Sequence, residues 1–321
     1  MAARARARSA PRKRAAPPKR AAAKRAAAKG AAAKRAAAKG KPANKAAAGR
    51  PNRRPTKAPA HQSRMRRHRR LAVAYDTDGP RVRLGLLWFV CEMASAVLGV
   101  VGIAVLFSVT AGVAAMQTAR CWRKDGARPS RQIAGAIAAL LVPAAAFTTG
   151  LVGLALLVGA VASVLAAFAA SATARRRQNP WALAGVTVRC WLFAGFAAAC
   201  VVLTARFSLG GAIALLLVVA AYETGDYIVG SGAANPYEGP VAGATAILVV
   251  TFAITAVGVR PFTFPESFLL GALAAVLCPV GQLMASLVLP HFDSPASALR
   301  RLDSLLLLAP AWALVVGVLV K

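Results

Sequence analysis

The stretch AIALLLVVAAYETGDYIVGSGAANPYEGP, from Ala212 to Pro240, holds the two features on which the interpretation of this chain depends. An uninterrupted apolar run leads directly into a glycine-rich polar segment with three carboxylates, Glu223, Asp226 and Glu238. Similar apolar runs recur along the chain, and 58% of its 321 residues are hydrophobic. That share is too high for a soluble protein of this length. The sequence therefore predicts an all-α, polytopic transmembrane helix bundle.

Residues 1–80 form a separate segment of different composition. Residues 1–70 hold 25 of the 41 Lys and Arg residues and no Asp or Glu, so most of the net charge of +31 belongs there. Residues 21–40 repeat the units AAAKR and AAAKG, prolines flank them, and no apolar stripe is present. We expect a disordered cytoplasmic tail. Its charge suits a polyanion, either anionic lipid or nucleic acid, and the membrane domain that follows favours lipid.

Residues 81–321 are expected to form the membrane domain. The first apolar stretch, 84–117, would be about 50 Å long as one helix, against a hydrocarbon core of about 30 Å. We expect a break around Gly99–Gly102, and one long tilted helix is the alternative. The expected spans number nine and lie near 84–101, 102–118, 133–149, 150–172, 181–204, 208–224, 240–259, 267–289 and 304–320.

The charges between the spans predict the topology. With the tail inside, basic residues gather in the cytoplasmic loops 119–132, 173–180 and 290–303, whereas the opposite loops carry only Arg206 and Arg260. This positive-inside bias predicts an inner (plasma) membrane protein with the N-terminus in the cytoplasm and the C-terminus outside. Loop 225–239 is also placed on the cytoplasmic side.

Polar residues within the spans are candidates for function, because burying them in lipid is costly. Glu92 and Arg189 are the charges deepest in apolar sequence, and they could pair within the bundle or serve only structure. A second polar segment, 281–308, contains Gln282 and Asp303. Carboxylates and arginines that meet at a cytoplasmic membrane face suit a phosphorylated or nucleotide substrate that acts on a lipid. Ordinary loop chemistry is the alternative.

Four segments in this order resemble the motifs of the phosphatidate cytidylyltransferase (CDP-diacylglycerol synthase) family. ETGDYIVG at 223–230 stands where the family has Asp-Thr-Gly-Ala-Tyr-Phe-x-Gly, and PYEG at 236–239 keeps the end of its next motif. GQLMAS at 281–286 is similar to Gly-Asp-Leu-x-Glu-Ser, and LRRLDS at 299–304 to the closing motif, before a final apolar span. The resemblance covers roughly residues 82–320, with its motifs in the C-terminal third.

The resemblance implies cytidylyl transfer from CTP to phosphatidate in phospholipid biosynthesis, with Mg²⁺ as cofactor. A homodimer is also expected. The implied metal ligands are Glu223, Glu238 and Asp303. The implied catalytic residues are Asp303 and Arg301. The implied nucleotide-binding residues are Gly225, Asp226, Tyr227, Gly230, Glu238, Gly239 and Arg300.

The chain also departs from the family pattern. Gln282 and Ala285 replace acidic residues, Arg300 reverses a charge, and the paired lysines of the second motif are missing. Because the acidic residues are implied to organise metal and triphosphate, an alternative stays open. In that alternative the chain is a catalytically inactive membrane scaffold whose tail binds anionic lipid or nucleic acid. A transporter is a third interpretation.

Overall fold

The computed structural model describes residues 81–173, 179–231, 235 and 237–320. Every regular element among them is a helix, which confirms the all-α prediction for this part of the chain. The predicted tail, 1–80, lies outside the described residues. The helices are α3 (Arg81–Val97), α4 (Gly99–Lys124), α5 (Arg131–Phe147), α6 (Thr149–Thr173), α7 (Pro180–Phe207), α8 (Leu209–Gly230), α9 (Glu238–Val257), α10 (Phe264–Val288), α11 (Ser297–Arg300) and α12 (Leu305–Leu319).

Six of these helices are long and apolar enough to cross a membrane, so the described part is a multi-pass helix bundle by length and composition. The six are α4, α6, α7, α8, α9 and α10. Three shorter apolar helices, α3, α5 and α12, coincide with the other expected spans. A helix of 17 residues, such as α5, is about 25 Å long and falls short of a hydrocarbon core of about 30 Å. The count of nine spans stays a prediction.

Local sequence signals set the helix ends. The first apolar stretch is two helices rather than one, and the break lies at Gly99, whose φ of 71° only glycine adopts at little cost. Ser208 ends α7 and begins α8, and its hydroxyl accepts a hydrogen bond from the Gly211 amide at 3.0 Å. Gly258, also at φ 71°, ends α9 in a left-handed conformation.

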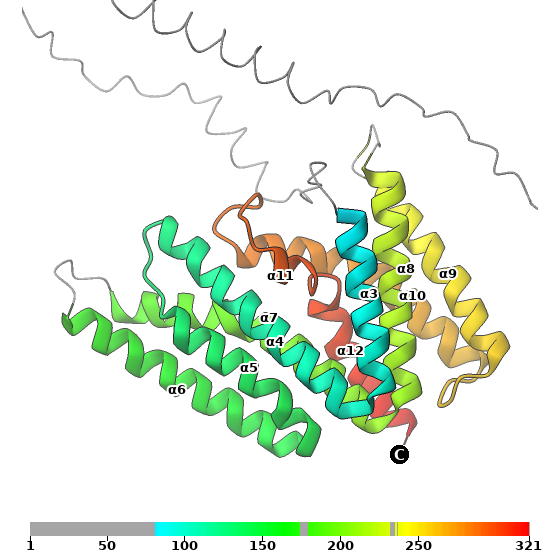
Figure 1. The fold of residues 1–321 in the computed structure, drawn as a ribbon, viewed down its shortest axis with the longest axis horizontal. Helices are drawn as coiled ribbons and strands as arrows, with labels where there is room; N and C mark the ends of the chain where they lie inside the picture. The colour runs from blue at the N-terminus through cyan, green and yellow to red at the C-terminus, as the bar shows by residue number, and fades with distance from the viewer. Residues whose placement is uncertain (1–80, 174–178, 232–234, 236, 321) are drawn as a thin grey trace, which may run out of the picture. The chain divides into compact units, whose positions relative to one another are not determined.

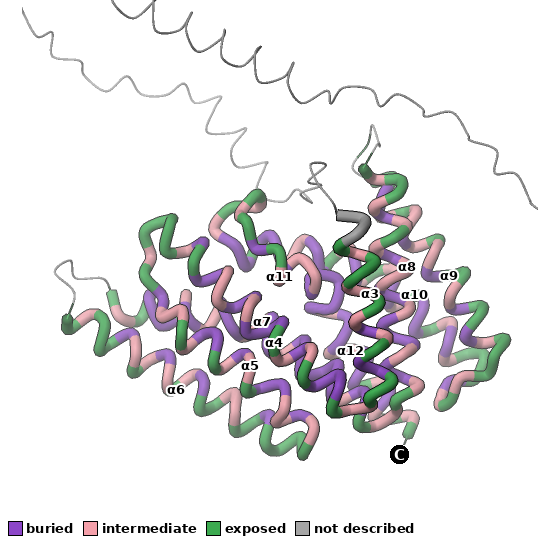
Figure 2. Tube along the Cα trace, viewed as in Figure 1, coloured by how far each residue is buried: buried purple, intermediate pink, exposed green. Residues whose placement is uncertain are grey.

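Helix α7 is the centre of one side of the bundle, where α4, α5, α6 and α12 pack against it (Figure 1). Small residues allow these close contacts: a Cβ on Gly195 of α7 would lie 3.1 Å from the Ala138 Cα of α5. On the other side α8 packs against α9, α10 packs against both α9 and α12, and α3 lies along α4 and α8. Buried positions concentrate in α7 and α12, whereas the outer faces of α6 and α9 are exposed (Figure 2).

Helix α8 is longer than the sequence indicated. Residues 225–230 were expected in a loop, but α8 runs to Gly230, so Gly225, Asp226 and Tyr227 are helical. A Cβ on Gly225 would lie 3.0 Å from the Gly243 Cα of α9. Gly225 therefore serves the close packing of α8 on α9, and the polar side chains after Tyr222 project from a rigid helix rather than from a loop.

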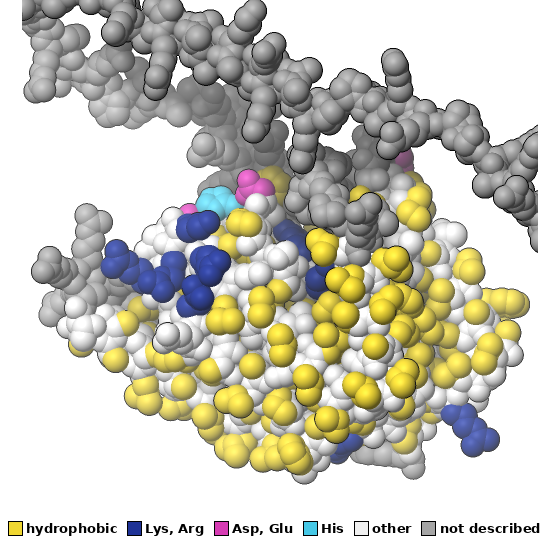
Figure 3. Space-filling view, in the orientation of Figure 1, with side chains coloured by type: hydrophobic (Ala, Val, Ile, Leu, Met, Phe, Trp, Pro, Cys, Tyr) yellow, Lys and Arg dark blue, Asp and Glu magenta, His cyan; other side chains and the backbone are white. Residues whose placement is uncertain are grey.

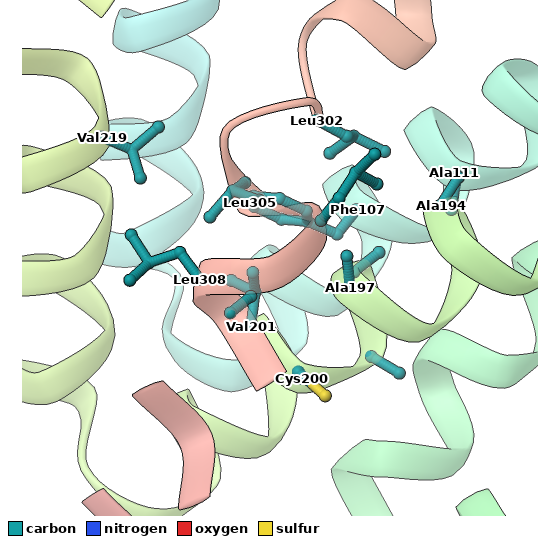
Figure 4. Close-up of a cluster of buried hydrophobic side chains, with 14 of the residues drawn as sticks. Phe107, Ala111, Ala194, Ala197, Cys200, Val201, Val219, Leu302, Leu305 and Leu308 are labelled. Atoms are coloured by element: carbon teal, nitrogen blue, oxygen red, sulfur yellow. The ribbon is translucent and has the colours of Figure 1, made fainter. Parts of the chain in front are cut away.

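An apolar cluster lies around the start of α12. Leu302, Leu305 and Leu308 gather there with Phe107 of α4, Val201 of α7 and Val219 of α8 (Figure 4). All six side chains are buried. The cluster fixes the turn between α11 and α12, which carries Asp303, against three other helices.

The surface has an apolar body and a basic end. Exposed apolar side chains cover much of the face shown in Figure 3, and Lys and Arg side chains gather at one end of it. Hydrogen bonds between described residues show which helices lie at each end of the bundle. The Trp122 indole of α4 donates to the Val288 carbonyl of α10 at 3.0 Å, near the basic end. At the other end, the Arg206 guanidinium donates to the Phe147 carbonyl at 2.9 Å.

Candidate functional site

The side chain of Gln282 links two segments that are far apart in the sequence, the C-terminal part of α8 and α10. Its Oε1 accepts a hydrogen bond from the Tyr222 hydroxyl at 3.3 Å, and its Nε2 donates to the Asp226 carboxylate at 3.1 Å. All three side chains are buried. The structure therefore joins the ETGDY segment of α8 to the GQLMAS segment of α10.

The third segment, the α11–α12 turn, is tied to α10 by Arg300. The Arg300 guanidinium donates to the Ser286 hydroxyl at 3.3 Å and to the Phe292 carbonyl at 2.6 Å. It also lies 3.9 Å from the Asp303 carboxylate. Arg300 thus holds the turn and its carboxylate in place, and its donors are engaged by protein groups.

Asp303 is buried in this turn, with 7% of its surface exposed. Its Oδ1 accepts hydrogen bonds from the Ser304 amide at 2.8 Å and the Ser304 hydroxyl at 3.4 Å. Burial raises the pKa of Asp303 to about 6, against the opposing effects of Arg300 and of the Ser304 hydrogen bonds, while Asp226 raises it further. A Cβ on Gly281 of α10 would collide with the Asp303 carbonyl oxygen, so glycine permits this close approach.

Two more carboxylates complete the cluster, Glu223 of α8 and Glu92 of α3. Glu92 is buried, and the Trp88 side chain hydrogen-bonds it. Both carboxylates interact electrostatically with the Arg301 guanidinium, and Glu223 also with Asp303 and Asp226. Arg301 reaches α3, since its Nη1 would lie 3.6 Å from a Cβ on Gly85.

We call the group Glu92, Glu223, Asp226, Asp303, Arg300 and Arg301 the carboxylate–arginine cluster. Four carboxylates against two guanidinium groups give it a formal charge of 2 − 4 = −2 when all are ionised. An excess of negative charge in a low-dielectric setting favours the binding of protons or cations. The cluster lies between α3, the C-terminal half of α8 and the α11–α12 turn (Figure 1).

The cluster fits Mg²⁺ only in part. Within the described residues, no group of three or more His, Cys, Asp or Glu side chains could hold a metal ion, so the implied set of Glu223, Glu238 and Asp303 is not assembled. The Asp226 carboxylate is already hydrogen-bonded to the Gln282 amide. Glu223 and Asp303 remain as a pair, which suits a Mg²⁺ ion that takes its other ligands from substrate phosphates and water.

The Glu238 side chain contacts Asn235 and no member of the carboxylate–arginine cluster in the described part of the chain. It is exposed at the start of α9, and its Oε1 accepts a hydrogen bond from the Asn235 amide at 2.9 Å. The neighbouring Gly239 is buried in the first turn of α9, and Gly230 lies at the end of α8. Gly230 and Gly239 are therefore parts of helix ends, and residues 232–234 and 236 of the expected loop lie outside the described residues.

Glu92 and Arg189, the two deeply placed charges, are paired differently from the suggested arrangement. Glu92 faces Arg301 and Trp88, whereas the Arg189 guanidinium lies over the Trp122 ring at 5.3 Å from its centroid. The suggested Glu92–Arg189 pair is therefore wrong. Glu92 belongs to the cluster, and Arg189 anchors α7 to α4.

Three residues of this site, Tyr222, Ser286 and Ser304, were not selected from the sequence, whereas Glu92 was noted there as a charge deep in apolar sequence. Tyr222 and Ser286 hydrogen-bond to Gln282 and Arg300, Ser304 caps the Asp303 carboxylate, and Glu92 adds a charge. Ser286 and Ser304 lie within segments that resemble family motifs, which was a usable signal. Tyr222 was counted with the apolar run. Nothing in the sequence indicated which residue Glu92 would contact, because α3 is far from the motifs along the chain.

The chain matches no protein-family model, and no curated protein matches it.

Proposed function

We propose that this chain is a membrane-embedded protein of the phosphatidate cytidylyltransferase type, which forms CDP-diacylglycerol and pyrophosphate from CTP and phosphatidate. One observation carries the proposal. The polar residues of three resembling segments, separated by tens of residues, contact one another through Gln282, Arg300 and Asp303. Placing charged groups inside a membrane-spanning bundle is costly, so a group of this many indicates a functional site.

In the proposed reaction, a phosphate oxygen of phosphatidate attacks the α-phosphorus of CTP. A new P–O bond forms, the bond from the α-phosphorus to the bridging oxygen of the β-phosphate breaks, and pyrophosphate leaves. Bound Mg²⁺, held by Glu223 and Asp303, would supply charge neutralisation on the phosphates. Arg301, the less constrained arginine of the cluster, is assigned to a substrate phosphate. Arg300 is a positioning residue that acts through Asp303.

The proposed topology has nine spans, a cytoplasmic N-terminus and an external C-terminus, in the inner (plasma) membrane. The distribution of charge supports it. Described basic side chains of the α4–α5 connection and of the α11–α12 turn lie at the end of the bundle that holds the cluster, and Arg206 and Arg260 lie at the other end. The cluster then faces the cytoplasm, where CTP is available.

A second candidate function rests on Gln282. In the resembling family an acidic residue stands at this position, and here the Gln282 amide fills the space with a hydrogen bond to Asp226. That contact stabilises the site without a metal ion. It favours a non-catalytic membrane scaffold with the same fold, whose basic tail recruits anionic lipid or nucleic acid.

The test is CDP-diacylglycerol formation by the purified full chain with CTP, phosphatidate and Mg²⁺. We expect Asp303→Asn to lower the rate by about 100-fold or more, as loss of a charged group in such a site does. Glu238→Gln is the matched control, because it removes an exposed carboxylate outside the cluster, and it should leave the rate within about twofold. Absence of turnover by the folded wild-type protein would favour the scaffold.

A further inference from the structure

A cavity of about 480 Å³ lies at the basic end of the bundle, between the α4–α5 connection and helices α6 and α7. Three arginines line it, Arg123, Arg128 and Arg131. None of its lining residues belongs to the carboxylate–arginine cluster. The cavity is therefore a separate site to which the proposed reaction assigns no role.

The three arginines have no acidic partner among the described residues. The ion pairs found there join His291 to Asp125 and Arg300 to Asp303. No carboxylate lines the cavity. Ser130, the N-terminal cap of α5, lines it too, so the positive end of a 17-residue helix opens on the same space. Three guanidinium groups around one cavity present the donor geometry that suits a phosphate.

The rest of the cavity wall comes from α6 and α7, two of the helices long enough to cross a membrane. Ala166 and Ala170 of α6 and Leu183 of α7 line it beside the polar Gln132 and Thr187. An anion held there by the arginines would lie where membrane-spanning helices reach the basic end of the bundle, which is the level of the lipid headgroups. The phosphate of a membrane lipid is therefore favoured over a soluble phosphate.

We propose that this cavity binds the headgroup phosphate of an anionic membrane phospholipid. The arginines hold the phosphate at the depth of the headgroups. This lipid is a constituent of the bilayer and not the substrate of the proposed reaction. Such a site would fix the position of α6 and of the α4–α5 connection in the membrane.

The experiment titrates the detergent-solubilised full chain with dihexanoyl phosphatidylglycerol and with neutral dihexanoyl phosphatidylcholine, and follows binding by calorimetry. Phosphatidylglycerol is a phosphodiester without the phosphomonoester of phosphatidate, so the result does not depend on the proposed transferase activity. We expect the anionic lipid to bind and the neutral lipid to bind far more weakly. The double variant Arg128→Gln, Arg131→Gln should weaken binding by about thirtyfold, which is about 2 kcal/mol, the contribution of two basic residues near anionic headgroups.

The matched control is Arg120→Gln. Arg120 is exposed in the last turn region of α4, carries the same charge and does not line the cavity, so its variant should bind as the wild type does. The charge-conserving variant Arg128→Lys, Arg131→Lys keeps the charge but loses the guanidinium geometry, so it should weaken binding by less than the glutamine variant does. All variants retain the basic tail, so its attraction for anionic lipid cancels in the comparison.

Three outcomes would overturn the proposal. Equal loss of binding in Arg120→Gln would show that net charge, and not the cavity, attracts the lipid. Binding of the neutral lipid as tight as that of the anionic lipid would remove the role of the arginines. Competition by inorganic phosphate at concentrations comparable to the lipid would assign the cavity to a soluble anion.

Discussion

The two groups of arginines at the basic end of the bundle are used in opposite ways. Arg300 and Arg301 lie among four carboxylates, and the Arg300 side chain is only 21% exposed. Arg123, Arg128 and Arg131 surround an open cavity without a carboxylate among its lining residues. In the sequence both groups follow the same positive-inside rule, and nothing local separates them.

The difference teaches that burial, more than residue type, decides what an arginine does. A buried guanidinium group has lost its hydration and stabilises the fold only if protein acceptors replace the water. Arg300 satisfies this condition with a carbonyl, a hydroxyl and a carboxylate. An arginine at an open cavity keeps its water and can exchange it for a ligand. Mutations should therefore have large effects on stability in the cluster and small ones in the cavity.

Arg300→Gln is expected to have the largest effect. It leaves Asp303 and the Phe292 carbonyl without their cationic partner, and the loss of one member of a buried pair costs about 3–5 kcal/mol in free energy of unfolding. Denaturant unfolding of the purified protein in detergent at neutral pH measures it. A loss below about 1 kcal/mol would mean that Arg300 is solvated like the cavity arginines.

Asp303→Asn should change the pH dependence of stability. The pKa of Asp303 is about 6 in the folded protein against an ordinary value of 3.8, so the folded state binds the proton more tightly. The contribution of Asp303 to the free energy of unfolding is therefore fully present below its ordinary pKa. This contribution, about 3 kcal/mol in total, is lost as the pH rises through the pKa of the folded state. The asparagine variant should lack this decline with pH.

The melting temperature recorded across that pH window checks this prediction. Asp293→Asn is the control, because Asp293 is exposed in the connection after α10 and should leave the pH profile unchanged. Parallel profiles for the Asp303 variant and the wild type would contradict the pKa of about 6.

Gln282→Asp sharpens the comparison by adding a third acidic group within reach of Asp226. The new carboxylate would replace an amide that donates at 3.1 Å, and the repulsion should lower stability by about 2 kcal/mol without divalent ions. Added Mg²⁺ should restore much of that loss in the variant. Gln282→Leu, which removes the hydrogen bond but adds no charge, should show no response to Mg²⁺. Thermal unfolding with EDTA or Mg²⁺ distinguishes the two.

Arg128→Gln should have the smallest effect on stability. Arg128 is exposed at the cavity and makes no ion pair among the described residues, so the free energy of unfolding should change by no more than about 0.5 kcal/mol. The same denaturant assay as for Arg300→Gln checks it. A loss comparable to that of Arg300→Gln would remove the distinction between the two groups of arginines.

Much of the fold could be predicted from the sequence. Each of the nine expected spans coincides with a helix, and the break at Gly99 was expected, because hydropathy and glycine act over a few neighbouring residues. The end of α8 was not predicted. Glycines and carboxylates after Tyr222 suggested a loop, but the helix continues because Gly225 packs directly on α9. The contact of Gly225 with α9 joins residues that are too far apart in the sequence for a local pattern to predict it.

The candidate site was predicted only in its parts. Asp226, Arg300, Arg301 and Asp303 were selected from motifs, and the structure brings them together with Glu223. Glu238 was selected for the same reason and lies exposed beside Asn235. Glu92 was noticed for its cost in an apolar span, yet its neighbour Arg301 is some two hundred positions away and could not be inferred.

The sequence by itself determined that the chain is helical, where its apolar helices lie and which end is basic, since these properties are sums over neighbouring residues. The tertiary structure alone decided which polar groups meet. Asp226 and Gln282 are 56 residues apart and share a hydrogen bond only because α8 and α10 pack side by side. The tertiary structure also determines that Arg300 and Arg301 lie among carboxylates, whereas Arg123, Arg128 and Arg131 line an open cavity. The reason is that burial depends on all the helices that surround a side chain.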